Sequence, residues 1–342
     1  MPFDRSAPAR LRRNLAPAAL LVAIACGSSA VQTEAPLPGR WTSAAELPEP
    51  RRGVGVAELD GEIWVVGGIG ADRRALSRVD FYDPDLDQWL PGPPLPEPLH
   101  HVALAAADDR LFAIGGLQGE PALPVATVYA LDPDLGRWEV VEPLPRARGA
   151  LAVAVVDDVI YALGGQAADE SAIRDVWRFD PDEDRWDPLP PLPAPREALA
   201  ATAIGGVIYA VGGELGSAST AQATLDAFDT RTLRWERLSA MPTPRGELAA
   251  AAFDGRIHVV GGVTPAGPLD AHEAYDPRER RWLPLHPMPT ARYGLGVAVA
   301  EGRLYAVGGG SGAAGVTTGA NEFLSPLLPS RGGSPPDSAP QN

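Results

Sequence analysis

The chain has 342 residues, enough for two average domains or one large all-β domain, and its hydrophobic content of 45% supplies an ordinary core. Gly and Pro, with 37 residues each, are unusually frequent, which favours many short strands joined by tight turns. The formal net charge is -15, and the sequence contains no lysine. Because an acidic surface repels phosphate backbones and anionic lipids, we expect no nucleic-acid partner.

The start of the chain has the pattern of an export signal. Arginines at positions 5, 10, 12 and 13 precede an apolar run from Leu15 to Ala25. This run is too short to span a bilayer and contains Pro17, so we predict a signal peptide over residues 1–25. We interpret the polar, proline-containing residues 26–39 as a tether that leads into the folded part of the chain.

The predicted signal ends in the sequence VAIAC, at the only cysteine of the chain. This ending resembles the lipobox of bacterial lipoproteins. The resemblance implies that Cys26 receives a diacylglyceryl group and anchors the protein in the cell envelope, on the outer-membrane or periplasmic side. The alternative is cleavage after Ala25 and plain secretion, because AIA also fits a signal-peptidase site. In both cases the exported chain has no disulfide and depends on its core alone.

An internal repeat with a period of about 48 residues runs through the rest of the chain. Its Trp residues are at positions 41, 89, 138, 186, 235 and 282, and its Gly-Gly pairs begin at 67, 115, 164, 212, 261 and 308. The interval from each Trp to the next Gly-Gly pair is constant, and so is the interval from each Asp-Pro or Asp-Thr turn to the next Trp. Six units in such a fixed register do not arise by chance, so the repeat decides the fold.

Each unit predicts four antiparallel strands, which we call a to d from the axis outward. Strand a follows a corner that ends in arginine, strand b ends in Gly-Gly, strand c precedes the Asp-Pro turn, and strand d carries the Trp. Small residues at alternate positions of strand a let neighbouring sheets approach closely, and the Trp fills the wider outer gap. One four-stranded sheet cannot bury both of its faces alone, but a ring of six can.

The double glycine, the aromatic residue after it and the Trp at a fixed interval resemble the kelch repeat, whose units have about 50 residues. The resemblance covers Arg40 to about Pro326 and implies an all-β fold, a six-bladed β-propeller with four antiparallel strands per blade. The last unit lacks a Trp strand, and Trp41 lacks the strands that should precede it, so we predict that Trp41 completes blade six. We assign residues 40–326 to the propeller and 327–342 to a disordered tail.

The ligand site is expected on one face of the ring. Because strand directions alternate, the b–c loops and the d-to-a links emerge on the same face, which we call the loop face. The length variation of the repeat falls in the b–c loops, and their sequences differ widely. Variable loops on a rigid scaffold commonly carry binding, so we predict a ligand site on the loop face.

An arginine stands at the same place after the Trp, in the corner before strand a, in five of the six units. These candidate ligand-binding residues are Arg51, Arg148, Arg196, Arg245 and Arg292. One interpretation is a ring of fork-shaped donors for carboxylate groups. The other is a structural role at the corner, which the repetition favours, because ligands seldom need five equivalent groups. The second unit has Leu99 at this place.

The next two positions of each unit break the repeat and supply the remaining candidates, Arg52, His100, His101, Glu197, Glu247 and Tyr293. Blade one faces blade four and blade two faces blade five, so we expect Arg52 opposite Glu197. By the same argument His101 lies opposite Glu247. Because alternate side chains of a strand point to opposite faces, we expect His101 rather than His100 to face Glu247. Such groups suit a small-molecule or peptide site, although they also fit a solvated rim.

No His, Cys or Asp cluster has metal-ligand spacing, and no nucleophile elbow, P-loop or dinucleotide fingerprint is present, so neither a metal nor a cofactor is expected. We interpret His258, which replaces an aromatic residue in a strand b, as a substitution at the edge of the core. His272 and His286 lie singly in the sequence.

Two functions remain open. The first is a monomeric, non-catalytic binding module, tethered outside the cytoplasm, whose partner is a protein, a peptide or a glycan. The second is a sugar-active enzyme, because exported six-bladed kelch propellers include N-acetylneuraminate epimerase. Copper chemistry of the galactose-oxidase type is excluded, since that family needs a Cys–Tyr crosslink and Cys26 lies outside the propeller. The central opening of the loop face, around which these candidate residues lie, is called the mouth below. We favour binding, because no acid–base pair stands out among the residues of the mouth.

Overall fold

The structure is a computed structural model that describes residues 39–132, 136–216, 220–312 and 316–326. The predicted signal peptide, Cys26 and the predicted tail lie outside the described residues. Within the described ranges no helix could cross a membrane.

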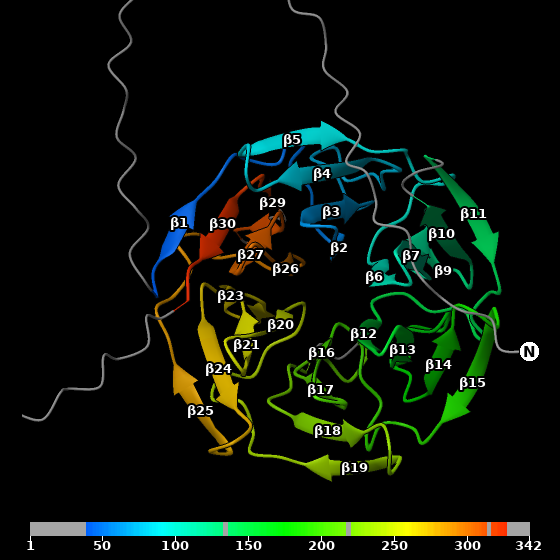
Figure 1. Cartoon of the computed structure of the whole chain (residues 1–342), viewed down its shortest axis with the longest axis vertical. Coiled ribbons are helices and arrows are strands. Elements are labelled where there is room, and N and C mark those ends of the chain that lie inside the picture. Colours follow the sequence, from blue (N-terminus) through cyan, green and yellow to red (C-terminus); the bar gives the residue numbers. More distant parts are fainter. Residues whose placement is uncertain (1–38, 133–135, 217–219, 313–315, 327–342) are drawn as a thin grey trace, which may run out of the picture. The chain divides into compact units, whose positions relative to one another are not determined.

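Six antiparallel four-stranded sheets stand like blades around an axis (Figure 1). Blade one contains β2 (Gly55–Leu59), β3 (Glu62–Val66), β4 (Val79–Asp83) and β5 (Gln88–Pro91). Blade two contains β6 (Ala103–Ala107), β7 (Arg110–Ile114), β10 (Val128–Asp132) and β11 (Arg137–Val141). Blade three contains β12 (Ala152–Val156), β13 (Val159–Leu163), β14 (Val176–Asp180) and β15 (Arg185–Leu189).

Blade four contains β16 (Ala200–Ile204), β17 (Val207–Val211), β18 (Leu225–Asp229) and β19 (Arg234–Arg237). Blade five contains β20 (Ala249–Phe253), β21 (Arg256–Val260), β24 (His272–Asp276) and β25 (Arg281–Pro284). Blade six contains β26 (Gly296–Ala300), β27 (Arg303–Val307), β30 (Asn321–Leu324) and β1 (Trp41–Ser43). Three b–c loops form small hairpins, β8 (Leu117–Gln118) with β9 (Leu123–Pro124), β22 (Val263–Thr264) with β23 (Gly267–Pro268), and β28 (Gly310–Ser311) with β29 (Val316–Thr317).

The first strand of the described residues closes the ring, as predicted. Strand β1 pairs with β30, and Trp41 stands opposite Leu324 in the register. Figure 1 shows β1 at the outer edge of blade six, next to β30. The pairing of β1 with β30 covers the edge of β30 that an open ring would expose.

The six tryptophans of the repeat connect neighbouring blades through hydrogen bonds. Each indole N–H donates to a backbone carbonyl that lies just beyond strand d of the preceding blade, over 2.7–3.2 Å. The accepting residue always has the same offset from the Trp of that preceding blade, as with Trp89, which donates to Ala45. The predicted place of the Trp between blades is confirmed, and the regular period follows from this repeated contact.

Candidate functional site

A closed ring of backbone hydrogen bonds forms the centre of the loop face, with one residue from each blade. Its members are Gly53, His101, Ala150, Ala198, Glu247 and Gly294. Each N–H donates to the carbonyl of the member in the preceding blade, over 2.7–3.0 Å. All six have φ between 47° and 63°, a left-handed conformation that costs a residue other than glycine about 1–3 kcal/mol. The hydrogen bonds of the ring offset this strain, and they hold in place the Cα atoms from which the side chains of the mouth extend.

Two glycines of the ring make room for side chains of their neighbours. A Cβ on Gly53 would lie 2.9 Å from Cε1 of His101, and a Cβ on Gly294 would lie 3.0 Å from Oε2 of Glu247. The imidazole of His101 therefore lies over Gly53 of blade one, and the carboxylate of Glu247 lies over Gly294 of blade six. Because these blades are neighbours, the two side chains meet, with His101 Nε2 3.6 Å from Glu247 Oε2. His101 therefore faces Glu247, as predicted, and the contact spans a hollow of about 100 Å³ at the axis.

The expected orientation of His100 and His101 is wrong, although His101 is indeed the one that faces Glu247. Strand β6 begins only at Ala103, and His101 has a φ of 48°, so the alternation of an extended strand does not apply. Instead, the Nδ1 atoms of the two imidazoles lie 2.6 Å apart. Burial, followed by the charges of His101 and Arg52, lowers the pKa of His100 to about 3. His100 is therefore neutral, and its hydrogen bond orients the ring of His101.

Glu197 makes the blade-four side of the mouth acidic. Its side chain is only 5% exposed, and burial, followed by the charges of Glu214 and Glu170, raises its pKa to about 7. His101 has the opposite effect on this pKa. Among the described residues, Oε2 of Glu197 has no hydrogen-bond partner. Glu197 can therefore take up or release a proton near neutral pH.

Arg52 and Tyr293 form the opposite, cationic and aromatic side of the mouth. The guanidinium carbon of Arg52 lies 5.7 Å from the ring centre of Tyr293, and both side chains cover Gly310. Arg52 belongs to blade one and Glu197 to blade four, which stand across the ring from each other (Figure 1). The mouth is therefore polarised, with Arg52 and Glu197 on opposite sides.

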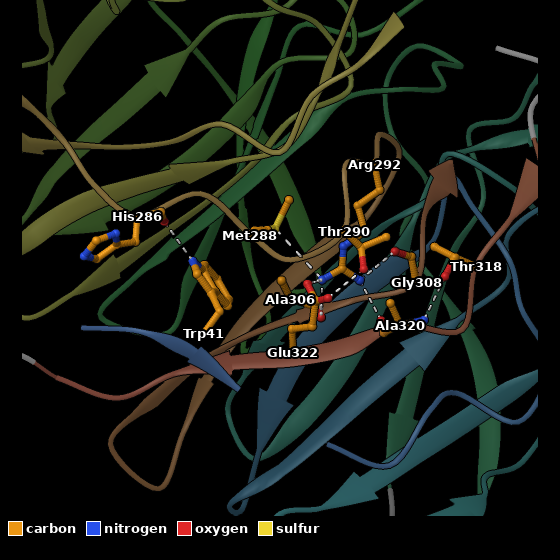
Figure 2. Close-up of polar contacts among 10 residues, drawn as sticks. All are labelled: Trp41, His286, Met288, Thr290, Arg292, Ala306, Gly308, Thr318, Ala320 and Glu322. Atoms are coloured by element: carbon orange, nitrogen blue, oxygen red, sulfur yellow. Dashed lines mark hydrogen bonds and ion pairs between the residues drawn. The ribbon is translucent and has the colours of Figure 1, made fainter. Parts of the chain in front are cut away.

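The five corner arginines lie beneath the mouth surface, with side chains that are 0–1% exposed. Each contacts a carboxylate in strand c of its own blade or just before it: Arg51–Asp80 (2.9 Å), Arg148–Asp175 (3.7 Å), Arg196–Asp226 (2.8 Å), Arg245–Glu273 (2.6 Å) and Arg292–Glu322 (2.7 Å). Figure 2 shows that Arg292 also donates to the carbonyls of Gly308 and Ala320. A ring of donors that face a ligand is not formed, because burial and these partners give the arginines a structural role.

Blade two lacks both halves of this ion pair. Leu99 replaces the arginine, and Tyr129 occupies the strand-c position that holds Asp80 in blade one. Both are buried, 1% and 4% exposed, in the same hydrophobic cluster. The missing arginine of the second unit is therefore explained by packing, because the apolar pair of Leu99 and Tyr129 replaces the buried charges.

The comparisons with known proteins bear on this architecture. The KLHDC2/KLHL20/DRC7 Kelch-repeats domain model matches residues 39–213, just over half of the chain. The chain belongs to the kelch-repeat family. A Kelch motif model also matches residues 195–242 and 244–289 of this kelch chain. A search of curated proteins finds no match.

A solved structure described as "Structure of YjhT" is similar to this kelch propeller. The two share 15% sequence identity with a TM-score of 0.70, and the match covers 82% of this chain and 96% of that chain. At this identity the likeness shows the fold alone. It confirms the kelch propeller architecture and leaves the function to the residues of the site.

Three exposed apolar side chains extend the loop face of the kelch propeller beyond its polar mouth. Leu123, Leu215 and Val316 are 52%, 45% and 59% exposed. They lie on the b–c loops of blades two, four and six. A polar centre with apolar residues on the surrounding loops fits an interaction surface better than a deep pocket for one small molecule.

The structure brings together three histidines that the sequence left apart. Nδ1 of His258 lies 2.9 Å from Nε2 of His272, and Nδ1 of His272 lies 3.1 Å from the backbone carbonyl of His286. The one sequence signal for this cluster is His258, which stands where the other kelch units have an aromatic residue. No group of three or more possible ligands for a metal ion occurs in the part of the chain that the structure describes.

Proposed function

We propose that this kelch propeller is a non-catalytic binding module, and that its loop face recognises a protein, a peptide or a glycan. The contact of His101 with Glu247 at the axis carries the proposal. A neutral imidazole both donates and accepts, a carboxylate accepts, and these side chains are 18% and 23% exposed. Both begin on a closed backbone ring, so little conformational entropy is lost when a ligand binds.

The polarised mouth defines which ligand groups fit. Arg52 and Tyr293 suit a carboxylate or the face of a sugar ring, whereas Glu197 suits a hydroxyl or amine donor. The apolar side chains on the b–c loops supply contact area around this centre. We expect the protein to act as a monomer that binds a partner with both polar and apolar groups.

The test is calorimetry with a ligand found by screening acidic sugars and peptides. His101→Ala and Glu247→Ala should each weaken binding by about 1–3 kcal/mol, because each leaves a polar partner unpaired. Arg292→Ala is the control, and it should mainly lower the melting temperature, because Arg292 is buried. If both mouth variants bind like the wild type, the ligand site is elsewhere.

One observation favours a sugar-active enzyme as the second candidate. The pKa of Glu197, about 7, suits a group that exchanges a proton at neutral pH. The reaction would be that of N-acetylneuraminate epimerase, which opens and recloses a sugar ring. Proton NMR of N-acetylneuraminate anomers tests this candidate. Faster anomer exchange that Glu197→Gln abolishes would support the enzyme, and an unchanged exchange rate would rule it out.

We also propose that the protein is exported to the bacterial cell envelope and anchored through a lipid on Cys26. The basic residues, the short apolar run and the sole cysteine at its end support this proposal. Two or more acyl chains give stable membrane binding, whereas a single chain gives only reversible binding. The alternative is the secreted protein without a lipid.

A further inference from the structure

A cavity of about 510 Å³ lies between blades five and six, away from the mouth. Its walls are mainly apolar, with Phe253 and Leu283 from blade five and Leu324 from blade six. His258 and His272 also line it. Pro284 and His286 are exposed at its edge, so a small molecule can enter from solvent.

The cavity is explained by a break in the repeat at this interface. In the other five blades the position of His258 holds Trp64, Phe112, Tyr161, Tyr209 or Tyr305. Three of these side chains contact an aromatic ring of the next blade: Phe112 contacts Phe179, Tyr209 contacts Tyr275, and Tyr305 contacts Tyr82, with ring centres 5.7–6.3 Å apart. Between blades five and six the corresponding residues are His258 and Leu324. Because an imidazole and a leucine fill less volume than two aromatic rings, or than Trp64 with Leu131 between blades one and two, space remains between the sheets.

The hydrogen-bond chain determines which atom of His258 is left over. The His286 carbonyl can only accept, so Nδ1 of His272 carries the proton between them, and Nε2 of a neutral His272 is an acceptor. Nδ1 of His258 must then donate to that Nε2. In neutral His258 this leaves Nε2 without a proton. That atom is buried and has no hydrogen-bond partner among the described residues.

Burial keeps both imidazoles neutral. Burial, followed by the charges of His272 and Arg256, lowers the pKa of His258 to about 3, against an opposing effect of the Phe253 backbone. Burial also lowers the pKa of His272 to about 4. The charge of Arg256 is already paired with two carboxylates, because its Nη1 lies 3.2 Å from Asp254 and its Nε lies 3.2 Å from Asp276. A charged ligand would therefore lose its hydration without gaining a free partner.

We propose that this cavity binds an uncharged, mainly apolar small molecule whose single hydroxyl or N–H group donates to Nε2 of His258. Its volume lies within the range of about 300–1,000 Å³ of ligand sites, and apolar walls with one polar group are typical of them. A ligand donor would give Nε2 of His258 the hydrogen bond that it lacks. Burial of the ligand's apolar surface against the cavity walls would supply the rest of the binding energy. The site is independent of the mouth and of the function proposed for it.

Two matched probes test the proposal on the full-length protein, p-cresol and its analogue p-xylene, which lacks the hydroxyl. Calorimetry and ligand-observed NMR should give a dissociation constant at least tenfold lower for p-cresol. The indole N–H of Trp41 provides a local signal, because it donates to the His286 carbonyl and the ring contacts His272 at 5.3 Å. Its NMR resonance should shift when p-cresol is added.

Two substitutions test separately the volume of the cavity and the acceptor atom Nε2 of His258. His258→Tyr restores the aromatic residue of blades three, four and six, and should abolish binding of both probes without lowering the melting temperature. His258→Leu keeps an apolar cavity and should remove the tenfold preference for p-cresol while p-xylene still binds. Glu247→Gln, in the mouth, should leave both affinities unchanged.

Three results would overturn the proposal. They are the absence of p-cresol binding at millimolar concentration, equal affinity of the wild type for both probes, and p-cresol binding that persists in His258→Tyr. A failure of the mouth variants to affect their own ligand would refute only the function proposed for the loop face, because the probes and residues differ.

Discussion

Blade two provides a natural template for testing what the buried arginines do in the other blades. It carries Leu99 and Tyr129 where blade six carries Arg292 and Glu322. We therefore consider Arg292→Leu, Glu322→Tyr and the double variant, which converts the ion pair of blade six into the apolar pair of blade two. All four members of this cycle differ only at two buried positions.

The contacts of Arg292 set the expected magnitude. It is fully buried, pairs with Glu322 over 2.7 Å, and donates to the carbonyls of Gly308, Ala320 and Ala306 over 2.6–3.1 Å (Figure 2). Each single substitution leaves one charge buried without its partner, which costs about 3–5 kcal/mol. The double variant removes both charges and leaves only neutral groups without their partners, namely the carbonyls and the Thr290 hydroxyl that donates to Glu322, at about 1–2 kcal/mol.

Urea unfolding and thermal melting measure this cycle. At about 2 °C per kcal/mol for a chain of this size, the single variants should melt about 6–10 °C below the wild type and the double variant about 2–4 °C below it. Arg185→Leu is the control, because that side chain is 57% exposed and should change stability by about 0.5 kcal/mol or less. If the double variant melts below both single variants, the buried charges are not coupled and the structural interpretation is refuted.

Three further predictions concern closure, pH and anchoring. Deletion of residues 40–46 should expose the edge of β30 and cause aggregation, and a truncated protein that melts like the full chain would contradict the closure. The pKa of Glu197 rises from 4.5 to about 7 on folding, so this residue destabilises the protein as pH rises through that window. Melting curves should show that Glu197→Gln raises stability by about 1–3 kcal/mol at pH 8 and has little effect at pH 4.5. Equal gains in stability at the two pH values would argue against a raised pKa of Glu197. In a bacterial host, Cys26→Ser should move the protein from the detergent-soluble membrane fraction to the soluble one, and an unmodified Cys26 in the native mass spectrum would disprove the lipid anchor.

The sequence by itself determined the architecture. Trp and Gly-Gly recur at a constant spacing because each blade repeats the same contacts, and the unpaired Trp41 at one end matches the missing strand at the other. Blade number, strand order and closure therefore follow from positions along the chain alone. The opposition of His101 to Glu247 also followed, because a ring of six units places blade two across from blade five.

Other features depend on contacts between strands or on backbone conformation, which spacing does not reveal. Sequence pattern alone left open whether the corner arginines face a ligand, because their burial depends on carboxylates that lie two strands further along the chain. The contact of His100 with His101 arises because His101 is left-handed, which cancels the alternation expected of a strand.

The histidine cluster between blades five and six was likewise decided by tertiary structure. His258 and His272 lie on adjacent strands, and His286 follows the next strand. The cavity beside them depends on Leu324, which is distant from His258 in the sequence and lies on the next blade. Sequence periodicity marks His258 as unusual, but only packing between the two blades shows that its neighbours leave an open space and an acceptor without a donor.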